Sequence, residues 1–147
     1  MKLSRWSAFS AFALVIGVAL FLGYSWYENR DPQGEATSNC YSMKLKPVPN
    51  KSDMVATAHN TVCDGFGGNS VVYVYIHGVD QDDSRKSLVF RYSDKYDVPS
   101  PTIEWINDSS LRISVGEVSQ VTKQLFSIDG VTVTYNIGKQ DYSPEIK

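Results

Sequence analysis

An uncharged, largely apolar stretch from Trp6 to Tyr27 constrains this chain more than any other part of the sequence. It holds 22 residues, and a helix needs about 20 apolar residues to cross a hydrocarbon core of about 30 Å. Lys2 and Arg5 precede it and Glu28 follows it, which by the positive-inside rule places the N-terminus in the cytoplasm. We therefore predict a single-pass membrane protein, with membrane lipid around Trp6–Tyr27 and a C-terminal domain that is periplasmic or at the cell surface.

A cleaved signal peptide is the alternative, since such peptides end at a pair of small residues two positions apart. Ala11 and Ala13 have that spacing but lie inside the apolar run. The sequence favours an uncleaved signal anchor, and cleavage stays open.

The chain divides into three predicted parts. Residues 1–27 form the signal anchor or transmembrane helix. Residues 28–50 contain Pro32, Gly34, Pro47 and Pro49 without a sustained apolar period, which predicts an extended tether. Residues 51–147 form the extracytoplasmic β domain.

Short runs rich in Val, Ile, Tyr, Phe and Thr, separated by turn residues, make the domain all-β. We expect about six strands in a small antiparallel meander that closes into a sandwich or an open barrel. The run 71–78, VVYVYIHG, is apolar or aromatic on both faces, which predicts a central strand. The dipeptide Asp129-Gly130 predicts a hairpin turn before the last strand. The expected strands are 53–63, 71–78, 87–92, 102–106, 111–115 and 131–137, with a further one near 125–128.

Charge and cysteine content limit the function classes. The chain carries 14 Lys and Arg against 16 Asp and Glu, and the basic residues are scattered, whereas nucleic-acid binding needs a basic patch. We expect no nucleic-acid partner. In an oxidising compartment Cys40 and Cys63 are expected to form a disulfide, although two free thiols or a bridge to another chain remain open.

Catalytic and metal-binding candidates all have a plainer structural interpretation. Cys63 beside His59 or His77 would give a thiolate nucleophile, and these residues with a carboxylate would suit zinc by ligand type. A bridged cysteine is no nucleophile, and the spacing supports no zinc site. We expect no catalytic residues and no metal.

Two loops resemble ligand-binding loops in composition only. Asp80, Asp82 and Asp83 superficially resemble a calcium loop but lack its glycine and its distant glutamate, so a solvated hairpin tip is favoured. Gly65, Gly67 and Gly68 have the composition of a phosphate-binding loop, but a strand follows instead of a helix, so they are interpreted as turn residues. We expect no cofactor.

Tyr73 and Tyr75 are the best interaction candidates, because two tyrosines on one strand face can anchor a protein partner. Core packing explains them equally well.

The domain resembles a loosely defined class of small bacterial membrane-anchored or lipoprotein-type envelope proteins with a β-rich domain of unknown function. The resemblance covers most of residues 52–137 and implies an envelope location, with no catalytic residues to transfer. It is carried by Asp53 with Ala56, Cys63-Asp64-Gly65, a Val-rich strand, Ile103-Glu104-Trp105, Leu111-Arg112-Ile113 and residues 130–135, GVTVTY.

The sequence therefore predicts an anchored, non-catalytic protein-interaction module, either an accessory subunit or an immunity-type protein that neutralises a toxin. The alternative is an extracytoplasmic thiol enzyme or hydrolase that uses Cys63 and a histidine.

Overall fold

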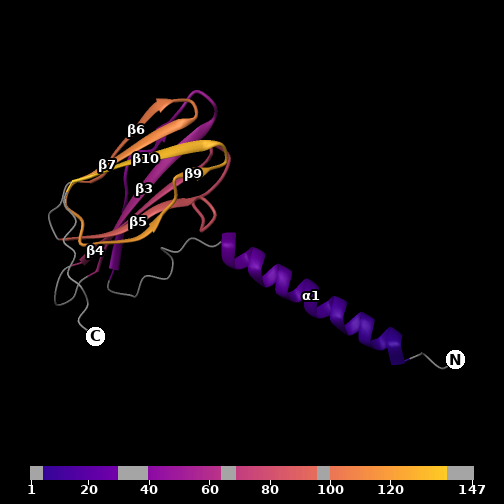
Figure 1. Ribbon diagram of the computed structural model, residues 1–147. Helices are drawn as coiled ribbons and strands as arrows, with labels where there is room; N and C mark the ends of the chain where they lie inside the picture. Colours follow the sequence, from indigo (N-terminus) through magenta and orange to yellow (C-terminus); the bar gives the residue numbers. More distant parts are fainter. Residues whose placement is uncertain (1–4, 30–39, 64–68, 96–99, 139–147) are drawn as a thin grey trace.

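A computed structural model describes residues 5–29, 40–63, 69–95 and 100–138 of the chain (Figure 1). These parts form one helix and ten strands. In chain order they are α1 (Arg5–Asn29), β1 (Cys40–Lys44), β2 (Val48–Pro49), β3 (Met54–Cys63), β4 (Asn69–Gly78), β5 (Leu88–Lys95), β6 (Thr102–Asn107), β7 (Ser110–Val115), β8 (Gln120–Gln124), β9 (Ser127–Ile128) and β10 (Val131–Ile137).

The first sheet has six strands in the order β1-β3-β4-β5-β8, with β2 also paired to β3. Its pairs are antiparallel. Strand β4 lies between β3 and β5 and is buried on both faces, as its apolar and aromatic alternation predicts: Val74 and Tyr75 point to opposite faces and both are fully buried.

The second sheet has four strands in the order β6-β7-β10-β9. In the β6–β7 hairpin, Ile103 faces Ile113 and Trp105 faces Leu111. The predicted turn before β10 is confirmed, because Asp129 and Gly130 both have positive φ, 46° and 79°, as a two-residue hairpin turn requires.

The prediction of an antiparallel meander of about six strands differs from the structure in the number of strands and in the direction of one strand pair. Strands β7 and β10 pair in parallel. After β7 the chain crosses to the first sheet as β8 and returns through β9, so β10 runs alongside β7 in the same direction. A parallel pair needs such a crossover and cannot arise from hairpins alone.

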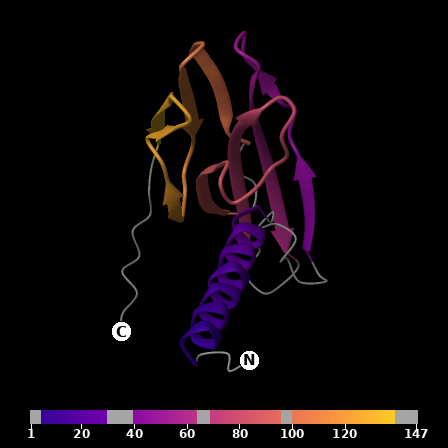
Figure 2. The same ribbon diagram turned by 90° about the vertical axis from the view of Figure 1, so that its right-hand side faces the viewer.

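The two sheets lie as separate layers (Figure 2). Side chains from both sheets form a common hydrophobic core. Among the described residues, hydrogen bonds also join the layers: Trp105 Nε1 donates to the Val48 carbonyl at 2.8 Å, and Asn50 Nδ2 donates to the Asp108 carbonyl at 2.9 Å. The fully buried members of the core include Ala56, Val74, Ile76, Phe90, Leu111 and Ile113.

The β domain begins earlier than the sequence predicts. Strands β1 and β2 fall within residues 28–50, the predicted tether, and both pair with β3. These strands are short, lie at a sheet edge and are separated by Pro47, so they show no clear apolar alternation. The hydrophobic pattern of the sequence therefore does not predict them. Residues 30–39 lie outside the described parts.

The predicted disulfide is confirmed. Cys40 and Cys63 face each other across the β1–β3 ladder and are bonded. The bridge therefore fastens the first strand to its neighbour.

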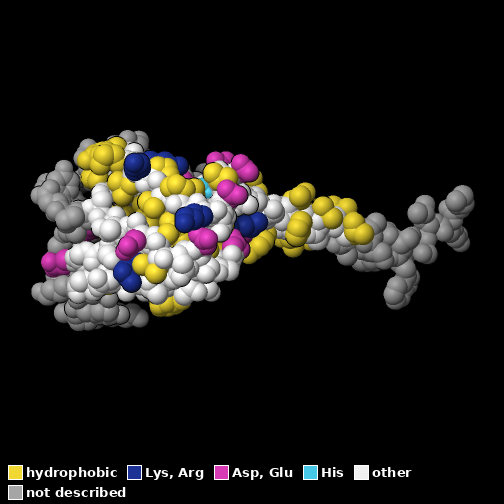
Figure 3. All heavy atoms as spheres, turned by 90° about the horizontal axis from the view of Figure 1, so that it is seen from above, with side chains coloured by type: hydrophobic (Ala, Val, Ile, Leu, Met, Phe, Trp, Pro, Cys, Tyr) yellow, Lys and Arg dark blue, Asp and Glu magenta, His cyan; other side chains and the backbone are white. Residues whose placement is uncertain are grey.

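Helix α1 extends from the β domain, and its apolar side chains between Leu14 and Tyr27 are largely exposed (Figure 3). Nevertheless, no helix in the described parts of the chain combines the length and the apolar character needed to cross a membrane. The predicted single-pass location, with a cytoplasmic N-terminus and an extracytoplasmic domain, is therefore wrong. Counting uncharged residues overstated the apolar length, because Tyr24, Ser25 and Trp26 are uncharged but carry polar groups.

Candidate binding face on the six-stranded sheet

The face of the six-stranded sheet that points away from the core carries polar and aromatic side chains. Thr57 and His59 of β3 alternate with the buried core residues Ala56 and Ala58. Because facing residues share a side of the sheet, Tyr75 and Tyr73 lie beside them on β4. The connection between β4 and β5, residues 79–87, folds back over this face.

Asp83 attaches the β4–β5 connection to the sheet. Its side chain is only 8% exposed, and its carboxylate contacts three strands. His59 Nε2 lies 2.7 Å from one oxygen and His77 Nε2 lies 3.1 Å from the other. Thr57 Oγ1 donates a short hydrogen bond, and Lys44 Nζ of β1 lies at 3.2 Å. We call these five residues the Asp83 cluster.

The electrostatics of the cluster favour an ionised carboxylate. Burial by itself raises the pKa of Asp83, but the hydrogen bonds from His59, Thr57 and Lys44 outweigh it and hold that pKa far below its usual range. A buried carboxylate with this many donors is stable only while they stay in place. The cluster thus fixes one conformation of the connection.

The cluster corrects one sequence interpretation. The sequence predicts a solvated hairpin tip that contains Asp80, Asp82 and Asp83, and the first two are exposed. Asp83 is buried because the connection turns back onto β3 and β4, a path that local composition cannot reveal. The available signal was that both histidines of the chain lie on predicted neighbouring strands close to an acidic loop.

The residue sets proposed for thiol and zinc chemistry are not assembled. Cys63 is bonded to Cys40 and so offers no thiolate. The ring nitrogens of His59 and His77 face Asp83 instead. Within the described ranges, no group of three or more His, Cys, Asp or Glu side chains is arranged to hold a metal ion. The glycines at 65, 67 and 68 lie outside those ranges.

Tyr73 and Tyr75 are packed together instead of forming an exposed patch. Their rings stack with centroids 6.5 Å apart, and together with Leu88 they form a small second core. Tyr75 is fully buried and Tyr73 is 7% exposed. The plainer interpretation, packing, describes their position.

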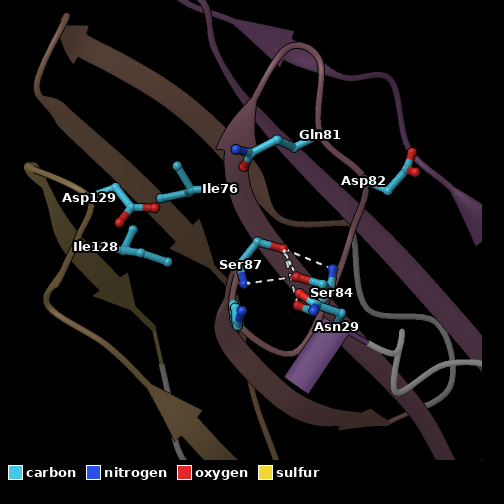
Figure 4. Close-up of a pocket in the computed structure, with 9 residues that line it drawn as sticks. Asn29, Ile76, Gln81, Asp82, Ser84, Ser87, Ile128 and Asp129 are labelled. Carbon is cyan, nitrogen blue, oxygen red and sulfur yellow. Dashed lines mark hydrogen bonds between the residues drawn. The ribbon is translucent and has the colours of Figure 1, made fainter. Parts of the chain in front are cut away.

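A cleft of about 600 Å³ lies beside the β4–β5 connection. The wall from the first sheet includes Ile76, and the opposite wall includes Ile128 and Asp129 from the β9–β10 hairpin (Figure 4). The connection and the end of α1 complete it. Seven of the nine lining residues are polar or charged: Asn29, Gln81, Asp82, Ser84, Lys86, Ser87, Asp129, with Ile76 and Ile128 apolar.

The two serines in the cleft are engaged with each other. Ser87 Oγ accepts a hydrogen bond from the Ser84 amide at 2.9 Å and donates to the Ser84 carbonyl at 3.1 Å. No histidine or cysteine is among the described residues that line the cleft.

Comparison with models of protein families, with curated proteins and with solved structures gives no match for this chain. The residues of the cleft and the Asp83 cluster therefore carry the functional argument by themselves.

Proposed function

We propose that this protein is a non-catalytic protein-interaction module, of the accessory or immunity type, whose partner binds at the cleft beside the β4–β5 connection. In this proposal the two sheets form a small β sandwich with the binding site at one end. The observation that carries it is the cleft itself, about 600 Å³ in volume and lined by segments far apart in sequence.

The lining favours a protein partner over a small apolar ligand. Pockets for small molecules are lined mainly by apolar and aromatic side chains, whereas this cleft is mostly polar with Ile76 and Ile128 as its apolar residues. Protein interfaces combine a small apolar centre with a polar rim in this way. Asp82, Asp129 and Lys86 add charges of both signs for orienting a partner.

Preorganisation supports the proposal as well. The connection that supplies Gln81, Asp82 and Ser84 is attached to the sheet at Asp83. A loop already held in one conformation loses less entropy when a partner binds. The Asp83 cluster therefore supports the cleft without lining it.

Site-specific photo-crosslinking tests the proposal. A photoreactive residue at Gln81, which lines the cleft, should give one adduct of defined mass and near-stoichiometric yield in cell extract. The same residue at Thr132, which is exposed on β10, is the matched control and should give no such adduct. Asp129→Lys should lower the yield at position 81. Equal adducts at both positions, or none at position 81, would contradict a partner at the cleft.

A further inference from the structure

A second depression, of about 290 Å³, lies on the outer face of the six-stranded sheet and shares no lining residue with the cleft. Strands β5 and β8 form its floor, and the end of α1 borders it. It is lined by Tyr27, Glu28, Arg85, Leu88, Arg91, Thr122 and Lys123.

Three cations meet in this small depression. Arg91 and Lys123 face each other directly across the β5–β8 ladder, an arrangement of like charges that is normally destabilising. Arg85 joins them from the β4–β5 connection, and Lys123 Nζ donates to the Arg85 carbonyl at 3.3 Å. Among the described residues that line the depression, Glu28 is the one acidic residue, and it lies beside the facing pair Arg91 and Lys123.

The environment of Lys123 disfavours its charged form. Burial is the largest cause that lowers the pKa of Lys123; of the neighbouring charges, Glu28 raises that pKa and Arg85 lowers it by less. An additional anion beside Arg91 and Lys123 would favour the charged form of both side chains.

Two of the cations are held in place by aromatic rings. The Arg85 guanidinium lies 4.2 Å from the centre of the Tyr27 ring, and the Arg91 guanidinium lies 5.2 Å from that of Tyr73. Such cation–π contacts reduce the freedom of a long side chain. A guanidinium also carries five N–H donors in a planar fork that matches the oxygens of a phosphate group.

We propose that the depression formed by Arg85, Arg91 and Lys123 is a binding site for a phosphate group. Charge, size and donor geometry all fit a compact oxyanion. Free phosphate and a phospholipid head group share this chemistry. The inference is independent of the cleft, so failure of either proposal leaves the other in place.

Titration with inorganic phosphate at constant ionic strength, with chloride as the compensating anion, is the first test. Calorimetry or amide NMR shifts should show saturable binding with a Kd of about 1 mM or tighter. Vesicles of phosphatidylglycerol, compared with vesicles of phosphatidylcholine, form the second arm and identify a head group as the source. Binding in either arm supports the site, and binding in neither contradicts it.

Variants separate the site from general effects of charge. Arg91→Gln and Lys123→Gln should each weaken phosphate binding by about tenfold or more, because each removes a charge-assisted contact. Arg112→Gln is the matched control, since Arg112 is half-exposed on the second sheet and pairs with Glu104 at 3.7 Å, and it should change nothing.

Glu28→Gln should strengthen phosphate binding, because it removes the acidic residue from the lining. Unfolding cannot increase the affinity for phosphate. The Glu28→Gln variant therefore still tests the proposal if a substitution in β5 or β8 destabilises the sheet. Equal binding by Arg91→Gln, Glu28→Gln and the unmodified protein would overturn the proposal.

Discussion

At the scale of single residues, Asp83 is the side chain on which the local structure depends most. Its carboxylate contacts side chains of β1, β3 and β4, whereas Asp83 itself lies in the connection after β4. Hydrogen bonds to a charged group contribute more than those between neutral groups. Asp83 therefore stabilises the connection and, through it, the wall of the cleft.

Asp83→Asn should lower the free energy of unfolding at pH 7 by about 2 to 3 kcal/mol, since it replaces a buried charged acceptor by a neutral amide. Urea denaturation measures the change. Asp80→Asn, an exposed substitution in the same connection, is the control and should stay within about 0.5 kcal/mol. Equal effects of the two would show that the cluster contributes nothing.

The contribution of Asp83 should depend on pH in a defined direction. Its pKa in the folded protein is depressed, so its stabilisation is fully present above the unfolded-state pKa of about 4 and is lost as the pH falls below that value. The stability difference between the unmodified protein and Asp83→Asn should therefore shrink between pH 4 and pH 2. A difference that stays constant over this interval would contradict an ionised, paired Asp83.

At the scale of elements, the strand signals that the sequence carries are of unequal strength. Strands β7 and β10 bury alternate apolar residues and β4 is buried on both faces, and each of the three lies within one or two residues of its predicted position. The stability of strands β1 and β2 depends on β3. Strand β1 is linked to β3 by the disulfide, and β2 is only two residues long. Such edge strands form because β3 is already in place.

Removing the bridge with a Cys40→Ser, Cys63→Ser double variant should cost about 3 kcal/mol of stability, because it releases a loop with a sequence separation of 23. Hydrogen exchange should increase most in β1, while amides of β10 change only through the global loss of stability. Alkylation of the unreduced protein is the companion measurement, and mass spectrometry should find no labelled cysteine. Two labelled cysteines would mean that the bridge is absent and would restore the thiol-enzyme alternative.

The β9–β10 hairpin turn should be sensitive at Gly130. Its φ of 79° suits glycine but strains any other residue, so Gly130→Ala should destabilise the protein by about 1 kcal/mol. Gly78→Ala is the control, because its added Cβ would meet only the Gln81 side chain, at an ordinary distance of 3.7 Å. Thermal unfolding compares the two, and an equal change in both midpoints would argue against the strained turn.

At the scale of the whole molecule, the two sheets depend on each other. Both sheets contribute buried side chains to one common core, and the chain passes from the second sheet to the first and back between β7 and β10. Neither sheet can bury its apolar face alone. The β domain should therefore unfold as a single cooperative unit.

Ile113→Ala tests that cooperativity. Ile113 lies on β7 of the second sheet and is fully buried, so its truncation should cost about 2 to 5 kcal/mol. Hydrogen-exchange protection should fall by a similar free energy in β4 of the first sheet. Thr132→Ala, an exposed change in the same sheet, is the control. Loss of protection confined to β6, β7 and β10 would show that the sheets unfold separately.

Apolar alternation, turn chemistry and cysteine count are local or nearly local properties, and they suffice to predict the all-β character, the main strands, the turn at Asp129-Gly130 and the pairing of Cys40 with Cys63. The membrane prediction is wrong because several uncharged residues of the N-terminal run carry polar groups, and the strand pattern leaves Tyr73 and Tyr75 undecided between surface and core. The parallel pairing of β7 with β10, the burial of Asp83 between two histidines and the proximity of Arg85, Arg91 and Lys123 appear only in the folded structure. Each of these depends on the path that a connection takes through space, and no local pattern encodes that path.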